Sequence, residues 1–150
     1  MSVNELIQEV EFGLENLEKV YQIIANIVTQ KVNQELKTSA LAYECMGYYN
    51  AIEHLIIRIF KHLRIKLPTG KFSHRDILKN FETLVDERKI EIDHEVVEII
   101  ENLMAFRHVA TKIYGFLIDR NKLQSITEDI ERNHKKIKQL ILNVLATIEK

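Results

Sequence analysis

Apolar residues recur at three- and four-residue spacings along most of the chain, which is the period of an amphipathic helix. The first run extends from Val3 to Val28 and predicts one long helix. The second run covers residues 40–63 and is the most apolar. Thr38 or Ser39 is expected to cap it, because a hydroxyl oxygen can accept the free backbone N–H groups of a first turn. These two runs predict two long, consecutive helices.

The second helix should end shortly after residue 63, because Pro68 disfavours a helical residue before it and Gly70 permits a turn. Residues 73–87 restart the helical period and predict a shorter third helix. Ser73 and Asp76 have the spacing of a capping box, with the aspartate as a shorter substitute for the usual glutamate. The pattern therefore predicts a helix start at Ser73.

Residues 92–110 form a fourth helical run, with Asp93 as the expected cap. This run is apolar on two faces, so we expect one face to pack in its own bundle and the other against a partner chain. The last helix is predicted from about Asp119 to Ile148, with residues 132–136 ("RNHKK") on its solvated face. Four or five helices account for nearly all of the chain.

The composition supports a single helical domain over residues 1–150. Apolar residues make up 46% and charged residues 29% of the 150, and the four glycines and one proline leave little material for hairpin turns. A chain of this size can bury one well-formed core. We therefore predict an all-α, four- to five-helix up-and-down bundle. The formal net charge of −1 argues against a wholly basic nucleic-acid binder, so any RNA binding should be local.

The only cysteine, Cys45, excludes an internal disulfide and suits a reducing compartment. It lies in an apolar helical run, where a lone cysteine is expected to pack as a small hydrophobe. No signal peptide is visible at the start of the sequence, and no window reaches the ~18 apolar residues of a membrane span. We expect a cytoplasmic protein with no membrane association.

No short motif indicates a metal or a cofactor. The six histidines include no pair with the spacing of a helical metal site and a third ligand in reach. There is no glycine-rich phosphate loop, no GxSxG turn and no cysteine nucleophile pattern. Most enzyme classes that are recognisable by short motifs are thereby excluded.

Two polar clusters interrupt the apolar pattern. Tyr49 and Glu53 lie four residues apart on one face of the second helix, as either a buried hydrogen-bonded network or part of a site. His74 and Arg75 lie at the start of the third helix, where charged residues can also serve only to complement the helix dipole. Neither cluster identifies a function by itself.

Three segments together resemble a known family. They are "LAYECMGYYNAIEHLIIRI", "SHRDIL" and "FRHVATKIYGFLIDRNKL", and in this order they resemble the HepT-like branch of the HEPN superfamily. Members of that branch are small helical ribonuclease toxins that generally dimerise and pair with a minimal nucleotidyltransferase antitoxin, MNT. Their signature is an arginine, four to six residues, a histidine, one residue and a tyrosine. Arg107 and Tyr114 match this signature, but Lys112 occupies the histidine position.

The lysine changes the chemistry that the resemblance implies. In similar ribonucleases the arginine stabilises charge on the scissile phosphate, and the histidine moves a proton. The reference pKa is about 6.5 for histidine and about 10.4 for lysine, so an unperturbed lysine is a poor base at neutral pH. Lys112 can hold a phosphate, or act as a base only if burial or positive neighbours lower its pKa by about three units.

His108 is a second candidate for the proton carrier. On an unbroken helix Arg107 and Lys112 would lie about 140° apart, whereas His108 lies only about 40° from Lys112. Convergence of Arg107 and Lys112 therefore requires a helix break or contributions from two subunits. Similar proteins commonly hold a histidine at this neighbouring position as well, so a structural or phosphate-contacting role for His108 stays open.

Tyr114 is at the position where, in similar toxins, the MNT partner attaches AMP, which would block an RNA groove by its bulk and charge. The alternative is a packing tyrosine at a helix end, followed by Gly115 as the C′ residue. In the expected homodimer the fourth helix lies near the two-fold axis, and the segments from Arg107 to Tyr114 line a shared cleft. Tyr49, Glu53, His74 and Arg75 are expected to support the site or contact RNA.

Three functional hypotheses follow. The first is the HEPN component of a HEPN/MNT toxin–antitoxin pair, a metal-independent endoribonuclease that needs no cofactor and is neutralised by AMPylation. The second is a catalytically impaired HEPN domain that binds RNA or a nucleotide, or scaffolds a partner, as a dimer. The third is a helical interaction module with no nucleic-acid role. The residue at position 112 distinguishes the first two.

Overall fold

The computed structural model describes residues 2–149. This part of the chain forms α1 (Val3–Thr29), α2 (Gln34–His62), α3 (Ser73–Glu87), α4 (His94–Ala110), the short 3₁₀ segment η1 (Gly115–Leu117) and α5 (Arg120–Glu149). Within these residues there is no strand, and no helix has an apolar stretch long enough to cross a membrane. The predicted all-helical bundle is confirmed.

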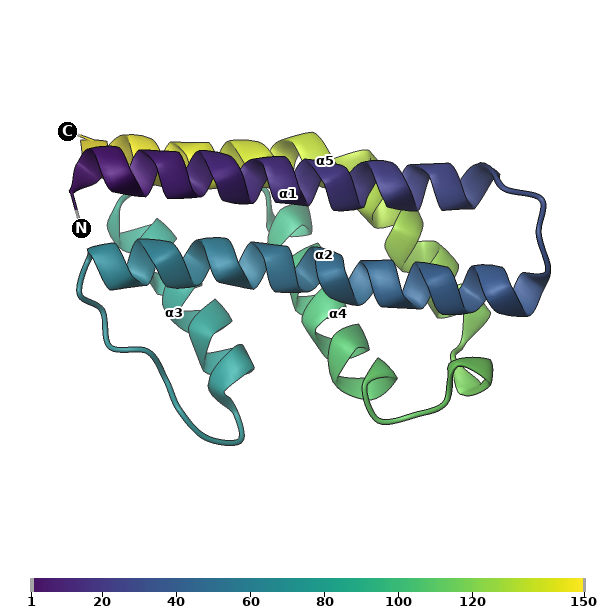
Figure 1. Ribbon diagram of the computed structural model, residues 1–150. Coiled ribbons are helices and arrows are strands. Elements are labelled where there is room, and N and C mark those ends of the chain that lie inside the picture. The colour runs from purple at the N-terminus through teal and green to yellow at the C-terminus, as the bar shows by residue number, and fades with distance from the viewer. Residues whose placement is uncertain (1, 150) are drawn as a thin grey trace.

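The helix α2 organises the bundle. Helices α1 and α2 form a long antiparallel hairpin, and α5 lies along α1, so that both ends of the chain lie at the same end of the molecule (Figure 1). The shorter α3 and α4 pack against α2 on the side away from α1 (Figure 1). The helix α2 contacts α1, α3, α4, η1 and α5. Polar side chains of α2 can therefore bond to residues of several other elements.

The start of α2 corrects the prediction that Thr38 or Ser39 is its cap. The helix begins at Gln34, because the Asn33 side chain accepts hydrogen bonds from the Glu35 and Leu36 backbone N–H groups at 2.8 and 3.4 Å. Thr38 lies one turn inside the helix, where its hydroxyl donates to the Gln34 carbonyl. Residues 34–37, which are mostly exposed, therefore form the first turn of α2.

The predicted capping box at Ser73 is also wrong. Ser73 is the first residue of α3, and the N-cap is Phe72, which makes no side-chain capping bond. The turn is instead held by backbone bonds, from Ser73 N–H to the Gly70 carbonyl and from Asp76 N–H to the Phe72 carbonyl. Gly70 supports this turn with a φ of +95°, a conformation that other residues rarely adopt. The hydroxyl of Ser73 is thus not used for capping.

The cap predicted for α4 is confirmed, and Asp119, predicted only as the approximate start of the last helix, also acts as a cap. Asp93 accepts from the Glu95 backbone N–H at 2.9 Å, and Asp119 accepts from Asn121 and Lys122 at 3.0 and 3.2 Å. Cys45 is fully buried, and its burial raises the pKa of the thiol to about 12. It is therefore a packing residue, as predicted.

A buried polar network joins α1, α2 and α5. His134 Nδ1 lies 2.9 Å from the Tyr48 hydroxyl, and its Nε2 lies 2.8 Å from a Glu18 carboxylate oxygen. The imidazole stacks on Tyr21 with ring centroids 3.9 Å apart. The placement of residues 132–136 on a solvated face is therefore wrong for Asn133 and His134, which are 1% and 4% exposed. His134 shares the apolar stripe of α5, which the neighbouring charges obscured.

Candidate functional site

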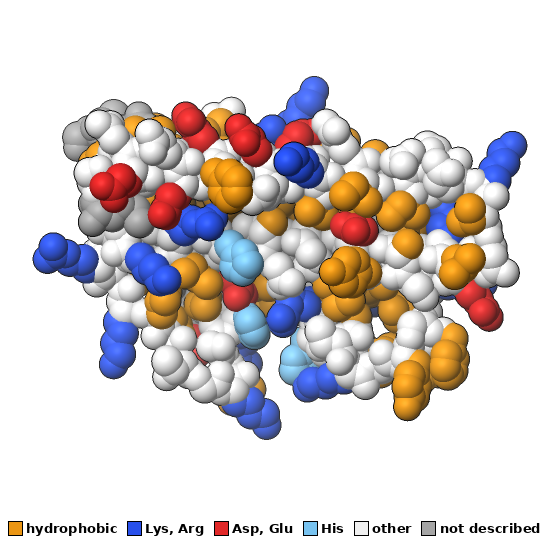
Figure 2. All heavy atoms as spheres, viewed as in Figure 1, with side chains coloured by type: hydrophobic (Ala, Val, Ile, Leu, Met, Phe, Trp, Pro, Cys, Tyr) orange, Lys and Arg blue, Asp and Glu red, His pale blue; other side chains and the backbone are white. Residues whose placement is uncertain are grey.

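A cleft of about 540 Å³ opens between the start of α3 and the end of α4. Most of the predicted site residues line it. They are joined by two aromatic or basic residues before α3 and by apolar residues of α4: the full lining is Lys71, Phe72, His74, Arg75, Met104, Ala105, Arg107, His108, Val109 and Lys112. Figure 2 shows histidine and basic side chains gathered at this gap between α3 and α4. A cleft with this basic lining suits an anionic ligand.

Arg107 is held in a fixed direction by α2. Its Nε donates to the Asn50 side-chain oxygen at 2.7 Å, across the contact between α4 and α2. This bond uses one N–H group of a planar guanidinium that offers several, and the other edge can take a phosphate in a two-bond geometry. Arg107 is half-buried and lines the cleft, so it is positioned for an anion before one binds.

The helix α4 ends between Arg107 and Lys112. Its last residue is Ala110, and Lys112 follows in a turn whose backbone N–H donates to the Val109 carbonyl at 3.0 Å. The continuous helix assumed for the 140° separation is therefore absent, and both side chains line the same cleft within one chain. Lys112 Nζ lies 3.1 Å from His108 Nε2, which links two of the predicted residues directly.

Tyr49, Glu53 and His74 form a hydrogen-bonded chain behind the cleft. The Tyr49 hydroxyl donates to Glu53 Oε2 at 2.8 Å, and His74 Nδ1 contacts both Glu53 oxygens at 2.8 and 2.9 Å. Burial raises the pKa of Tyr49 and the neighbouring Glu53 adds to the effect, so its hydroxyl remains a donor. The two predicted polar clusters, one on α2 and one on α3, are thus a single unit.

Arg75 and Phe72 form the outer rim of the cleft. The Arg75 guanidinium lies over the Phe72 ring, with its carbon 4.5 Å from the ring centroid, and Lys71 Nζ lies 5.7 Å from the same centroid. Phe72 is 53% exposed. An exposed ring beside basic groups can stack on a nucleobase.

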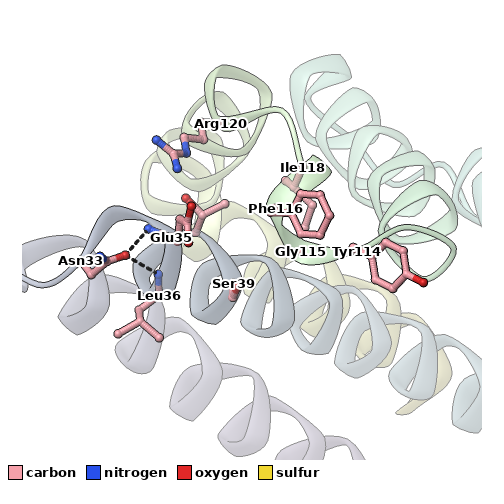
Figure 3. Close-up of a pocket in the computed structure, with 10 residues that line it drawn as sticks. Asn33, Glu35, Leu36, Ser39, Tyr114, Gly115, Phe116, Ile118 and Arg120 are labelled. Carbon is pink, nitrogen blue, oxygen red and sulfur yellow. Dashed lines mark hydrogen bonds between the residues drawn. The ribbon is translucent and has the colours of Figure 1, made fainter.

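Tyr114 lies outside this cleft in the single chain. It is 73% exposed, directly precedes η1 and stacks on Phe116 with ring planes 3° apart. Figure 3 shows it at the edge of a second cavity of about 540 Å³, which Ser39 of α2 and Arg120 of α5 also line. The exposure does not fit the alternative of a packing tyrosine.

The alternative in which Gly115 is the C′ residue of α4 is also wrong. The helix ends at Ala110 with Thr111 as its C-cap, and Gly115 instead begins η1. A Cβ atom on Gly115 would lie 2.8 Å from the Ser39 hydroxyl oxygen, so the missing side chain allows η1 to approach α2 closely. The glycine positions the segment after Tyr114 rather than ending a helix.

Sequence reasoning did not identify Asn50, Lys71 and Phe72 as site residues. Asn50 lies three residues before Glu53, so its spacing on a face with polar neighbours was an available signal. Lys71 and Phe72 carry no such signal, because their position at the cleft depends on the turn before α3. Among residues 2–149, no three His, Cys, Asp or Glu side chains are grouped closely enough to hold a metal ion.

Comparison with known families gives one finding. A family model described as a HepT-like protein matches residues 40–148, which contain most of α2, all of α3 and α4, and nearly all of α5. Comparisons with curated proteins and with solved structures give no match. The family match covers well over half of the chain and includes every residue of the α3–α4 cleft. The chain therefore belongs to the HepT-like family of the HEPN superfamily.

Proposed function

We propose that this protein is the HEPN component of a HEPN/MNT toxin–antitoxin pair and that it cleaves RNA without a metal. The observation that carries the proposal is the α3–α4 cleft, where Arg107 is anchored by Asn50 beside Lys112, His108 and Arg75. Such a basic cleft can bind a phosphodiester and stabilise the charge that builds on it. Membership of a family associated with ribonuclease toxins supports the same activity.

The proposed roles follow from the contacts. Arg107 binds the scissile phosphate, and Lys112, at the position of the signature histidine, contacts the same phosphate or the leaving oxygen. His108, bonded to Lys112, orients the ammonium. Arg75 and Phe72 contact the neighbouring nucleotide at the rim. The protein acts in the cytoplasm, a reducing compartment that suits its free, buried Cys45.

The proposed antitoxin is an MNT-type nucleotidyltransferase that transfers AMP from ATP to the Tyr114 hydroxyl and releases pyrophosphate. The support is accessibility, since the tyrosine is 73% exposed and follows Arg107 and Lys112 closely in the chain. An added phosphate and adenine would bring negative charge near the RNA path. Incubation with such an enzyme and ATP should add one or more adenylyl groups to the native protein but none to Tyr114→Phe, with Tyr43→Phe as the exposed control.

The second candidate is a HEPN dimer that binds RNA or a nucleotide without cutting it. The observation that favours it is the contact between Lys112 Nζ and His108 Nε2, because an ammonium that donates to this imidazole occupies the lone pair a base would need. The cleft would then hold a nucleic acid and lack its proton carrier. This candidate shares the phosphate-binding role of Arg107 with the first.

An RNA cleavage assay separates the two candidates. The native protein should cut single-stranded RNA to products with a 2′,3′-cyclic phosphate, and Arg107→Ala should reduce the rate by roughly 10²–10³-fold because a charge-stabilising group is lost. Lys79→Ala, an exposed lysine of α3 outside the cleft, is the matched control. If only Lys112→His cuts RNA and the native protein does not, the binding candidate replaces the ribonuclease. If neither the native protein nor any variant binds RNA, the remaining hypothesis is a helical interaction module with no nucleic-acid role.

A further inference from the structure

We propose that His74, oriented by Glu53, is the catalytic residue that takes the proton from the attacking 2′-hydroxyl. The inference rests on the proposed ribonuclease function, and it assigns the proton transfer to a residue outside the Arg107–Tyr114 signature. The ribonuclease needs a proton carrier that Lys112 is poorly suited to be. His74 supplies an imidazole in the same cleft, on α3 instead of α4.

The contacts of His74 leave the correct nitrogen available. Glu53 as a carboxylate can only accept hydrogen bonds, so the 2.8 and 2.9 Å contacts require that His74 Nδ1 carries the hydrogen. The lone pair of the neutral ring is then on Nε2. The His74 side chain is 44% exposed and lines the cleft, so a substrate can reach it. His74 has the arrangement of a carboxylate-oriented general base.

Glu53 is itself positioned for this role. It is 8% exposed, and its Oε2 also accepts a bond from the buried Tyr49 hydroxyl. A carboxylate bonded to an imidazole fixes the tautomer and the ring direction, and it stabilises the imidazolium that forms when Nε2 accepts a proton. Tyr49 and Glu53 are therefore positioning residues that act through His74.

The helix α2 sets the spacing between the proton carrier and the phosphate-binding arginine. Arg107 is bonded to Asn50, and His74 is bonded to Glu53. These two α2 residues are three apart in sequence, which places their Cβ atoms about 5–6 Å apart on one helix face. Arg107 and His74 are thus anchored on neighbouring positions of α2 and line the same cleft, which allows one nucleotide to engage both groups.

The proposed step balances within the cleft. His74 Nε2 removes the proton from the 2′-hydroxyl as its oxygen attacks phosphorus and the O2′–P bond forms. The P–O5′ bond breaks, and the leaving 5′-oxygen takes a proton from the Lys112 ammonium. The products are a 2′,3′-cyclic phosphate and a 5′-hydroxyl, and the proton on His74 returns to the neutral lysine through solvent. Arg107 stabilises the charge on the phosphate throughout.

Two other histidines in polar contacts, one of them outside the cleft, are less suited to this step. His108 Nε2 is engaged by Lys112 Nζ at 3.1 Å. His134 is 4% exposed and bonded on both nitrogens, to Tyr48 and Glu18, far from the cleft lining. His74 alone among these three combines a carboxylate partner with an exposed position in the cleft.

The test uses the native protein, His74→Gln, His74→Ala and Glu53→Gln, with His94→Gln as control, since His94 is exposed at the far end of α4. His74→Gln should lower the turnover rate on RNA roughly 10²–10⁴-fold, and Glu53→Gln roughly 10–100-fold. The affinity for an RNA with 2′-O-methyl groups, measured by fluorescence anisotropy, should change less than about twofold in His74→Gln. The larger loss of affinity expected for Arg107→Ala is the comparison. Added imidazole should partly restore cleavage by His74→Ala but not by Arg107→Ala.

The outcomes are distinct. Cleavage by the native protein that His74→Gln retains overturns the role of His74 and leaves the ribonuclease function standing. Loss of cleavage in His74→Ala without rescue by imidazole, together with weaker RNA binding, shows a binding residue and also overturns the inference. A native protein that cuts no RNA overturns the ribonuclease function and the role of His74 together.

Discussion

The bond between Arg107 and Asn50 shows how a single side chain determines what the cleft presents. The Nε of the guanidinium is fixed at 2.7 Å from the amide oxygen, so the arginine does not have to be ordered when an anion arrives. Lys112 is exposed in a turn and has a histidine as its neighbour. At the residue scale, the cleft combines one charge that is anchored on α2 with one that is exposed in a turn.

Glu82, on the α3 face that packs near α4, is a carboxyl whose proton affinity is changed by the fold. Burial and the nearby carboxyl of Glu101 raise its pKa from 4.5 to about 7. The folded protein therefore binds this proton more tightly than the unfolded chain does. The contribution of Glu82 to stability is complete below about pH 4.5 and is lost as the pH rises to about 7.

We predict that Glu82→Gln increases the free energy of unfolding at about pH 8, because the native carboxyl is then ionised where the fold disfavours its charge. The gain should be roughly 1 kcal/mol, since the carboxyl is partly solvated and its charge is screened. At about pH 4 the same substitution should have little effect, since the native carboxyl is already protonated. Urea denaturation at both pH values measures the difference. Glu98→Gln, exposed on α4, is the control, and an equal effect of Glu82→Gln at the two pH values would contradict the assignment.

At the scale of elements, the bundle is joined by a polar chain through its apolar core. Burial lowers the pKa of His134, so the imidazole is neutral near pH 7. The pKa of Glu18 is lowered to about 2, chiefly by the hydrogen bond that Glu18 makes with His134, so this carboxyl is ionised. The neutral ring then donates from Nε2 to Glu18 on α1 and accepts at Nδ1 from Tyr48 on α2. One side chain of α5 thereby fixes the register of two other helices.

Tyr48→Phe is predicted to lower the free energy of unfolding by about 1–3 kcal/mol, because it leaves a buried imidazole acceptor without its donor. Tyr48 has no exposed surface, so no water replaces the hydroxyl without a rearrangement. Chemical denaturation followed by circular dichroism measures the change. Tyr43→Phe, at a tyrosine that is 71% exposed, should shift stability by less than about 0.5 kcal/mol. Equal effects of the two substitutions would mean that the bond to His134 contributes nothing.

The period of apolar residues predicts the interiors of the helices well, because each helix buries one stripe against α2 or its neighbours. Helix ends are predicted where a strong cap follows a clear break, as at Asp93. They are missed where the first turn is largely exposed, as before Thr38, because no buried apolar stripe marks it.

The candidate site is predicted by residue type but not by connection. Arg107, Lys112, His74 and Glu53 are all identifiable as polar interruptions or as parts of the family signature. The bond between His74 and Glu53 joins α3 to α2 and depends on how the two helices cross. Hydrophobic periodicity specifies which face of each helix is buried, but it does not specify that crossing.

At the scale of the whole molecule, the end of the bundle that carries the signature also carries exposed apolar side chains. Val109 of α4 is 51% exposed, and Phe116 and Leu117 of η1 are 74% and 58% exposed. Figure 2 shows hydrophobic side chains gathered over η1, across α4 from the α3–α4 gap. Such a cluster is unusual on a monomer and supports the proposed homodimer at this end.

We predict that the protein has twice the chain mass of 17.7 kDa in solution. Light scattering after size exclusion should show this mass for the native protein, and Leu117→Glu and Val109→Glu should shift the equilibrium to the monomer, because a carboxylate in an apolar interface is left without a partner. Phe12→Glu is the matched control, since Phe12 is 57% exposed on α1, away from η1. A native monomer, or dissociation by Phe12→Glu alone, would contradict this interface.

If the dimer forms through η1, the Tyr114 of each chain lies beside the interface, and dimerisation should slow AMP transfer to Tyr114.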